Sequence, residues 1–195
     1  MAGRYREDID LDEIKALPLL EYGGEIVVVD TPEAFEKAMV EIFKFDMAGF
    51  DTETRPSFKK GVQYQVALLQ IFCGKKCYLL RLNKIGFPDA LRLWFENETI
   101  TKVGLSLRDD IRELRKKRRI NPKGLIDLQD IVGDYGIEAL SLKKLSAIVM
   151  GGRISKRQQL SNWEASNLNE KQKIYAATDA WVCLEIYNHL VGKTG

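Results

Sequence analysis

The fold is decided by Met47-Ala-Gly-Phe-Asp-Thr-Glu53, Gln65-Val-Ala-Leu-Leu-Gln-Ile-Phe72 and Lys76-Cys-Tyr-Leu-Leu-Arg81. These apolar stretches are rich in residues that favour strands. Only a short turn containing Gly74 separates the second stretch from the third, which predicts a hairpin. We therefore expect three consecutive antiparallel strands.

Strand and helix patterns alternate on both sides of this centre. Glu25-Ile-Val-Val-Val-Asp30 predicts a strand, and Thr31-Pro32-Glu33 is a strong helix start. Further helices are predicted at 88–97, from Ser106 to about 118, and near 128–135, 141–149 and 169–191, with strands at 100–104 and 124–127. An antiparallel start followed by this alternation predicts an α/β protein with a mixed sheet flanked by helices.

Size and composition are those of one globular domain. The chain has 195 residues, of which 45% are hydrophobic and 30% charged, so it can bury a core. We expect an N-terminal extension over 1–24 with a short helix near 10–17, and one domain over 25–195. No apolar run reaches the roughly 18 residues of a membrane span, and the first residues are charged where a signal peptide is apolar. We expect a soluble, intracellular, cytoplasmic protein without a membrane partner, whose oligomeric state the sequence leaves open.

Charge and cysteine content restrict the possible sites. Three cysteines fit reduced thiols, and a single histidine argues against a zinc site of the Cys/His type. The formal net charge is only +2, but Arg115-Lys-Lys-Arg-Arg119 is a dense basic run, and Arg153, Lys156 and Arg157 form a looser one. Either run can be a solvated helix end or a set of phosphate contacts, and composition does not decide between them.

Two acids end the first of the three central strands. Asp51 and Glu53 are two positions apart, so a strand places both on one face. Two carboxylates at the edge of a buried strand repel each other unless a cation lies between them, and carboxylate oxygens suit Mg²⁺ or Mn²⁺. Solvated acids at a strand end are the alternative.

Two predicted helices carry further acids. Asp109 and Asp110 lie in the first turn of the helix that starts at Ser106, where acids are also common as partners of the helix dipole. Tyr175 and Asp179 are four positions apart, so a helix brings them to one face, among small alanines.

In order and spacing these pieces resemble the DEDD exonuclease superfamily. Its three motifs are matched by Phe50-Asp-Thr-Glu53, by the segment from Lys102 to Leu114 with Asp110, and by Tyr175-x-x-x-Asp179. A tyrosine four residues before the last aspartate is typical of the tyrosine branch. Gln159-Leu-Ser-Asn-Trp163 adds to a resemblance that is greatest to the Werner-syndrome type exonuclease domain, with bacterial ribonuclease D next. The resemblance covers roughly 25–191.

This resemblance implies a ribonuclease-H-like fold and a metal-dependent 3'→5' exonuclease that releases nucleoside 5'-monophosphates. Asp51, Glu53, Asp110 and Asp179 would hold two divalent cations, Mg²⁺ or Mn²⁺, roughly 3.5–4 Å apart. The hydroxyl of Tyr175 would orient the attacking water, and Glu53 would also contact the terminal 3'-hydroxyl.

Substrate contacts are predicted from the cationic and aromatic residues that usually hold single strands. In many relatives the second motif has Asn and an aromatic residue before its aspartate, whereas here Ser106 and Asp109 occupy those positions. Core packing is an equal alternative for Trp163. The predicted substrate-contacting residues are Thr52, Arg55, Lys59, Lys60, Ser106, Trp163 and Arg157.

The nature of the polymer is left open by the motifs. Many ribonuclease D relatives continue into a further helical domain, so a chain that ends at 195 favours the Werner type. We expect single-stranded or recessed 3' ends of DNA as the favoured substrate. A ribonuclease D-like enzyme acting on RNA, and a non-catalytic nucleic-acid-binding module on the same fold, are the alternatives.

Overall fold

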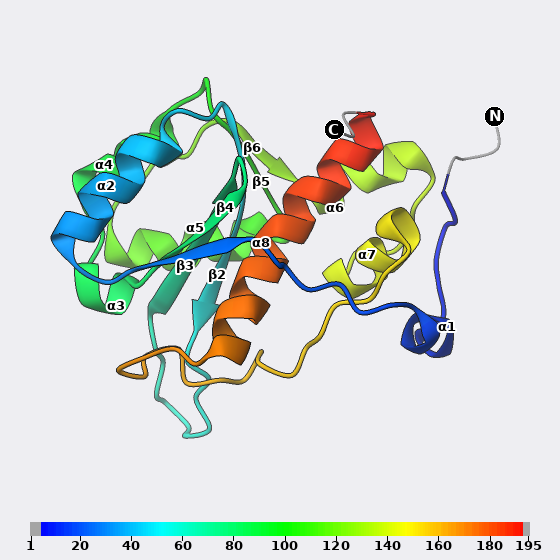
Figure 1. Ribbon diagram of the computed structural model, residues 1–195, viewed down its shortest axis with the longest axis horizontal. Coiled ribbons are helices and arrows are strands. Elements are labelled where there is room, and N and C mark those ends of the chain that lie inside the picture. The colour runs from blue at the N-terminus through cyan, green and yellow to red at the C-terminus, as the bar shows by residue number, and fades with distance from the viewer. Residues whose placement is uncertain (1–4, 193–195) are drawn as a thin grey trace.

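The computed structural model describes residues 5–192. Its centre is a six-stranded sheet in the order β1-β4-β3-β2-β5-β6 (Figure 1). β3 runs antiparallel to both of its neighbours, whereas β1 pairs with β4, β2 with β5 and β5 with β6 in parallel. The α/β class with a mixed sheet, predicted from the sequence, is confirmed.

Most elements lie within a few residues of their predicted bounds. In chain order they are α1 (Leu11–Ala16), β1 (Glu25–Val29), α2 (Pro32–Ile42), β2 (Met47–Thr54), β3 (Val66–Cys73), β4 (Lys76–Leu80), α3 (Leu82–Ile85), α4 (Asp89–Glu96), β5 (Thr101–Gly104), α5 (Leu107–Lys117), β6 (Leu125–Asp127), α6 (Leu128–Ile131), the 3₁₀ helix η1 (Val132–Tyr135), α7 (Leu142–Met150) and α8 (Glu170–Val191).

Two local features depart from the expected pattern. The single-turn helix α3 was not predicted, because four residues are too few to show a helical period. The helix expected over 128–135 divides into α6 and the 3₁₀ helix η1, which ends at Gly136 in the left-handed conformation with φ of 79°. A 3₁₀ segment of this length is a common connector after a short α-helix.

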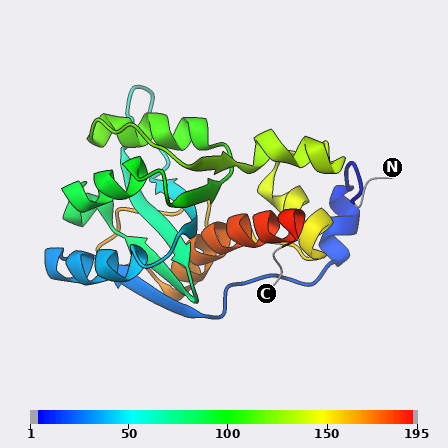
Figure 2. The ribbon, with the colours of Figure 1, turned by 90° about the horizontal axis from the view of Figure 1, so that it is seen from above.

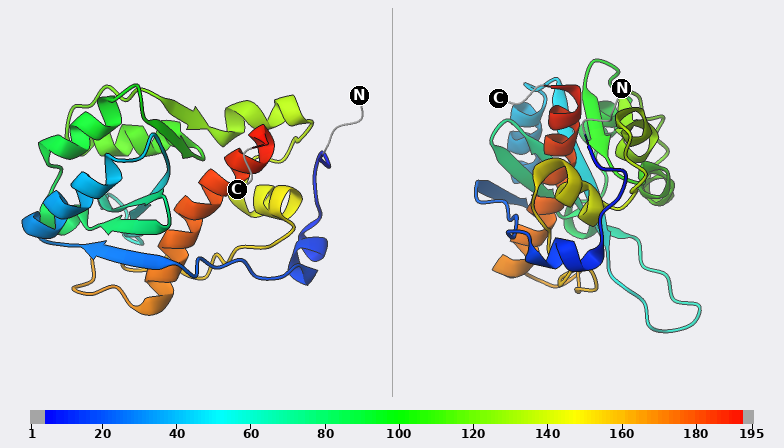
Figure 3. Two further views of the ribbon diagram at one scale, coloured as in Figure 1. Left: turned by 45° about the horizontal axis from the view of Figure 1, so that its top comes forward. Right: turned by 90° about the vertical axis from the view of Figure 1, so that its right-hand side faces the viewer.

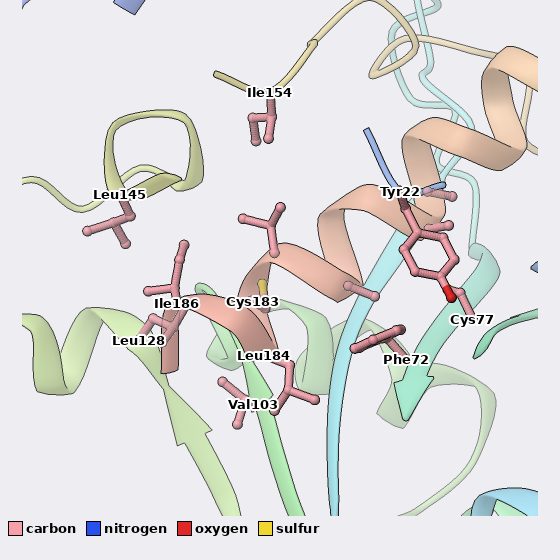
Figure 4. Packing of buried hydrophobic residues seen from close by; sticks show 14 of the residues in the cluster. Tyr22, Phe72, Cys77, Val103, Leu128, Leu145, Ile154, Cys183, Leu184 and Ile186 are labelled. Carbon is pink, nitrogen blue, oxygen red and sulfur yellow. The ribbon is translucent and has the colours of Figure 1, made fainter. Parts of the chain in front are cut away.

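The sheet is buried on both faces. α8 lies on one face, with α7 packed against it, while α2, α4 and α5 lie on the other face (Figure 2). Every residue of β3 is buried, as a central strand covered on two sides requires. On the α8 face, Cys183, Leu184 and Ile186 lie among side chains from the strands and loops around them (Figure 4).

α8 crosses β2 at very short range. A β-carbon added at Gly49 would lie 2.1 Å from the backbone oxygen of Ala180, so only glycine fits at this crossing. The close approach brings the middle of α8 directly over the strand that carries Asp51 and Glu53. The crossing therefore places the first sequence motif, on β2, next to the third, on α8.

The segment before β1 packs against the rest of the molecule. Ile14 of α1 is buried in a small cluster with Ala147 of α7. Leu20 donates its backbone N–H to the carbonyl of Arg153 at 2.8 Å, and the backbone N–H of Tyr22 donates to the hydroxyl of Thr178 at 2.9 Å. The boundary predicted at residue 25 stays a prediction, and the ends of the two predicted ranges, 1–4 and 193–195, lie outside the described residues. No described helix is long and apolar enough to cross a bilayer.

Candidate active site

Three carboxylates from two elements meet at one point. Asp51 and Glu53 project from the same face of β2, and Asp179 projects from α8 above them. One carboxylate oxygen of each lies within 4.8 Å of the others. The side chains of Glu53 and Asp179 are buried, so the group is not a patch of solvated acids. The structure thus brings together the first and third motifs, as the resemblance implies.

Asp110 reaches the same cleft from the first turn of α5. It lines a cavity of about 430 Å³ together with Asp51, Glu53 and Asp179. The hydroxyl of Thr52 donates a hydrogen bond to its carboxylate. Asp110 stands outside the group of three closest carboxylates, at the side of the cleft next to Thr52. Thr52, predicted as a substrate contact, is thus part of the structure that places this acid.

The electrostatics of the cleft are unfavourable without a cation. Burial, together with Asp110 and Asp179, raises the pKa of Asp51 well above its usual range. Burial and the neighbouring carboxylates raise the pKa of Glu53 to about 10. Burial likewise raises the pKa of Asp110 to about 6 and that of Asp179 to about 7. A cation placed among these oxygens would favour the ionised forms that this environment disfavours.

Tyr175 lies one helical turn before Asp179, on the same face of α8. Its hydroxyl lies near the Asp179 carboxylate and favours the ionised form of that group, which moderates the rise in its pKa. Burial and the nearby carboxylates raise the pKa of this hydroxyl above its ordinary value. Tyr175 is therefore a poor general base and a well-placed hydrogen-bond donor.

Trp163 is packed against Tyr175. The ring centroids are 5.9 Å apart, and none of the Trp163 side chain is exposed. The prediction that it stacks on a nucleobase is wrong for this structure, because a fully buried ring offers no face to a ligand. Core packing, the alternative considered from the sequence, is what the structure shows.

The entry to α5 is held by a residue that the motif analysis did not single out. Ser106 has a φ of 58°, in the left-handed region, and is the only residue other than glycine with positive φ in the described part of the chain. Asp127, at the end of β6, accepts the backbone N–H groups of Ser106 and Leu107 at 3.0 and 2.7 Å, and that of Gln129 at 3.0 Å. Ser106 itself lines the carboxylate cleft. The signal available in the sequence was an aspartate at the end of a short predicted strand, directly before a helix.

Of the looser basic run, Lys156 reaches the carboxylates. It lines the cleft, and its charge favours the ionised form of Asp179, which moderates the rise in the pKa of that carboxyl. Arg157, predicted as a substrate contact, instead lines a neighbouring cavity of about 450 Å³ together with Arg153 and Lys171. The predicted basic segment is thus at the site, but a different residue of it faces the acids.

Arg55 and the two predicted lysines belong to the loop that follows β2. This loop, residues 55–65, projects from the body of the molecule (Figure 3, right). Arg55 lies 4.7 Å from the ring centroid of Tyr64 and pairs with Glu164 at 3.4 Å. Lys59 and Lys60 are exposed at the loop's turn. The three residues lie beside the cleft and not among the residues that line it.

The dense basic run lies at the C-terminal end of α5, where cations favour the helix dipole. Lys116 pairs with Glu113 at 2.7 Å, and Arg118 pairs with Asp89 at 2.6 Å. For Lys116 and Arg118, these ion pairs support the interpretation of the run as a helix end over that as a set of phosphate contacts.

The donor set fits hard divalent cations. All four acids offer oxygen ligands, three of them converge within 4.8 Å, and burial raises the pKa of each carboxyl. Mg²⁺ and Mn²⁺ prefer such carboxylate sites.

Known proteins are similar to this chain in both sequence and fold. A family model described as 3'-5' exonuclease matches residues 26–194. The chain is 33% identical over 184 residues to the bifunctional 3'-5' exonuclease/ATP-dependent helicase WRN of Mus musculus, covering 89% of this chain and 13% of that protein. It is 29% identical over 189 residues to a 3'-5' exonuclease of Arabidopsis thaliana, covering 89% of this chain and 66% of that one.

The chain thus spans only a small part of the mouse protein and about two thirds of the plant one. The crystal structure of Escherichia coli RNase D matches with a TM-score of 0.78 at 23% identity, covering 87% of this chain and 45% of that chain. This agreement shows the ribonuclease-H-like fold that the motifs imply. With its ordered acidic motifs and a family match over nearly its whole length, the chain belongs to the DEDD-type 3'-5' exonuclease family.

Proposed function

We propose that this protein hydrolyses nucleic acid from the 3' end and releases nucleoside 5'-monophosphates. The observation that carries the proposal is the convergence of Asp51, Glu53 and Asp179, with Asp110 and Tyr175 lining the same cleft. Such a set of oxygen ligands beside a hydroxyl donor suits metal-assisted hydrolysis of a phosphodiester.

In this proposal the four acids hold two divalent cations, Mg²⁺ or Mn²⁺. When bound, these cations supply Lewis-acid stabilisation of charge on the attacking and leaving oxygens. Tyr175 fixes the position of the attacking water through its hydroxyl, and its high pKa keeps that hydroxyl protonated. Thr52 holds the Asp110 carboxylate in place. Lys156, next to Asp179, is placed to contact a phosphate oxygen.

Glu53 is proposed to accept a hydrogen bond from the terminal 3'-hydroxyl. It lies in the same group of oxygens as Asp51 and Asp179. A contact of this kind with a free chain end restricts cleavage to termini, because an internal nucleotide has no 3'-hydroxyl to offer.

We propose DNA, with single-stranded or recessed 3' ends, as the favoured substrate. The resemblance of the motifs to the Werner-syndrome type supports this choice, whereas the likeness to RNase D shows the fold alone. Discrimination between the polymers depends on contacts to the 2'-hydroxyl. We also propose that the protein works inside the cell, in the cytoplasm.

The test is degradation of matched DNA and RNA oligonucleotides labelled at the 5' end, single-stranded or recessed, with Mg²⁺, Mn²⁺ or chelator. A ladder of shortened 5'-labelled products that requires both the cation and Asp179 is the expected result. Asp179→Asn is the inactive control, and Asp130→Asn, on α6, is the matched control expected to stay active. Intact binding without any degradation would establish the non-catalytic module instead, and faster loss of RNA would establish the exoribonuclease.

A further inference from the structure

A buried amide with no partner lies next to the acidic cluster. Gln70 is fully buried in the middle of β3, and neither its Nε2 nor its Oε1 has a hydrogen-bond partner. Among the described residues, it alone has both side-chain polar atoms buried and unpaired. A side-chain amide carries two N–H donors and a carbonyl acceptor, so leaving all of them unpaired destabilises the fold.

The strand register places this amide beside Asp51. Gln70 is paired directly opposite Asp51 in the antiparallel β2–β3 ladder, and its other lateral neighbour is Leu79 on β4. Residues directly opposite each other in such a ladder point to the same face, with β-carbons about 4.5–5.5 Å apart. Leu68 and Phe72, two positions before and after Gln70 on β3, are apolar core residues. Asp51 is therefore the polar residue next to the amide in this layer of the sheet.

We propose that Gln70 is a positioning residue of the metal site, whose Nε2 donates a hydrogen bond to the Asp51 carboxylate when the site holds its cations. The inference rests on the proposed function. Residues that ligate metals are commonly oriented by a second group, which accounts for an unpaired amide kept beside a ligand. Gln70 touches neither substrate nor cation in this role.

The test separates metal affinity from fold stability. Gln70→Leu and Gln70→Met replace the amide by apolar groups of similar volume, so one serves if the other fails to fold. Leu79→Met is the matched control, because it changes the other lateral neighbour of Gln70, on the side away from Asp51. Mn²⁺ binding is measured by calorimetry without nucleic acid, urea unfolding is measured in chelator, and kcat and KM are measured on a single-stranded oligonucleotide.

We expect both Gln70 variants to bind Mn²⁺ about 10–100-fold more weakly, the range usual for the loss of such a partner. Their urea midpoints in chelator should equal or exceed that of the parent protein, because two unpaired polar atoms have been removed. The value of kcat should fall while KM stays unchanged. Leu79→Met should leave Mn²⁺ affinity at the parent value.

Mn²⁺ affinity equal to that of the parent protein in both variants would overturn the inference. A lowered urea midpoint in chelator would overturn it as well, since the amide would then have a partner in the metal-free fold. If the parent protein neither binds Mn²⁺ nor degrades any oligonucleotide, the proposed function itself fails. An active parent with unaffected Gln70 variants removes only the role of Gln70.

Discussion

Tyr175 shows how a single side chain can serve the site without titrating. Its hydroxyl lies beside Asp179, and burial together with the nearby carboxylates raises its pKa and keeps the proton in place. A hydroxyl held this way is a fixed donor next to the position of the proposed attacking water. Removal of the oxygen alone should therefore affect the chemical step more than the cation site.

We expect Tyr175→Phe to lower kcat on the order of 100-fold, within the range that positioned proton donors contribute. Mn²⁺ affinity should change little, because all four carboxylates remain. Degradation of a 5'-labelled oligonucleotide and calorimetry of the free protein measure the two effects. Tyr187→Phe, further along the same helix, is the control and should keep normal turnover. Equal turnover of Tyr175→Phe and the parent protein would contradict the assigned role.

At this scale the sequence predicts residues whose spacing follows a regular element. Asp51 with Glu53, and Tyr175 with Asp179, follow the periods of a strand and a helix, and the structure brings them together. Such a spacing does not reveal burial, which is why the sequence left substrate contact and core packing as equal alternatives for Trp163, and the structure shows core packing. A periodic pattern also gives no information about the roles of residues in loops.

The entry to α5 shows how one element determines the place of an acid. Ser106 stands in the left-handed conformation and makes no side-chain cap, while Asp127 binds the backbone N–H groups at the start of the helix. At the start of α7, Ser141 has a φ of −95° and its side chain accepts the N–H of Lys144. Both serines directly precede the first turn of a helix. The positive φ of Ser106 destabilises the fold, whereas the side-chain cap of Ser141 stabilises it.

We expect Ser106→Gly to raise the free energy of unfolding by up to about 1 kcal/mol, because glycine adopts positive φ without the steric cost of a β-carbon. Ser141→Ala should lower it by about 1 kcal/mol through the loss of a cap. Urea unfolding in chelator measures both. A destabilised Ser106→Gly variant would show that the Ser106 side chain stabilises this turn.

The loop after β2 is the element that the sequence associates with substrate. Its two lysines are exposed, and it projects beside the cleft without lining it.

We expect Lys59→Ala combined with Lys60→Ala to weaken oligonucleotide binding and to reduce the slope of affinity against salt by about 0.7 for each phosphate that the protein no longer neutralises. Fluorescence anisotropy over a salt series, with a catalytically inactive background, measures this. The pair Lys15→Ala and Lys44→Ala, on distant elements, is the control, and an unchanged slope in the loop variant would refute the interaction.

Element types were predictable here because most segments are long enough to show a period or contain clear caps. Thr31 and Asn169 cap α2 and α8 through their side chains, as their residue types favour. The single turn of α3 offers no period, and η1 differs from an α-helix by a hydrogen-bond pattern that composition does not encode. Strand order was less accessible, since the place of β1 beside β4 depends on contacts between distant parts of the chain.

At the scale of the whole molecule the acidic cluster opposes folding in the absence of cations. The folded-state pKa values of Asp110 and Asp179 are raised from 3.8 to about 6 and about 7. Between pH 4 and pH 7 the folded protein therefore holds protons that the unfolded chain has released. Stability is lost as the pH rises through this window, by about 1.4 kcal/mol for each unit of pKa difference.

We expect the free energy of unfolding in chelator to fall from pH 4 to pH 7, and excess Mg²⁺ to restore most of the loss at pH 7. Urea unfolding at a series of pH values, with and without Mg²⁺, measures the effect. Asp179→Asn removes one of the titrating groups, so its profile in chelator should be shallower. A stability in chelator that does not depend on pH over this window would show that the carboxylates are ionised in the empty fold.

The contact between β2 and α8 also has a kinetic consequence. Asp51 and Asp179 lie far apart in the chain, and Gly49 leaves the space that the backbone of α8 needs where it crosses β2. Contacts between such distant segments form late, because the intervening chain must first lose its conformational freedom. We therefore expect the ability to bind a cation to be acquired late in refolding. A luminescent lanthanide added during refolding would time the docking of a single helix, separately from the collapse of the rest of the protein.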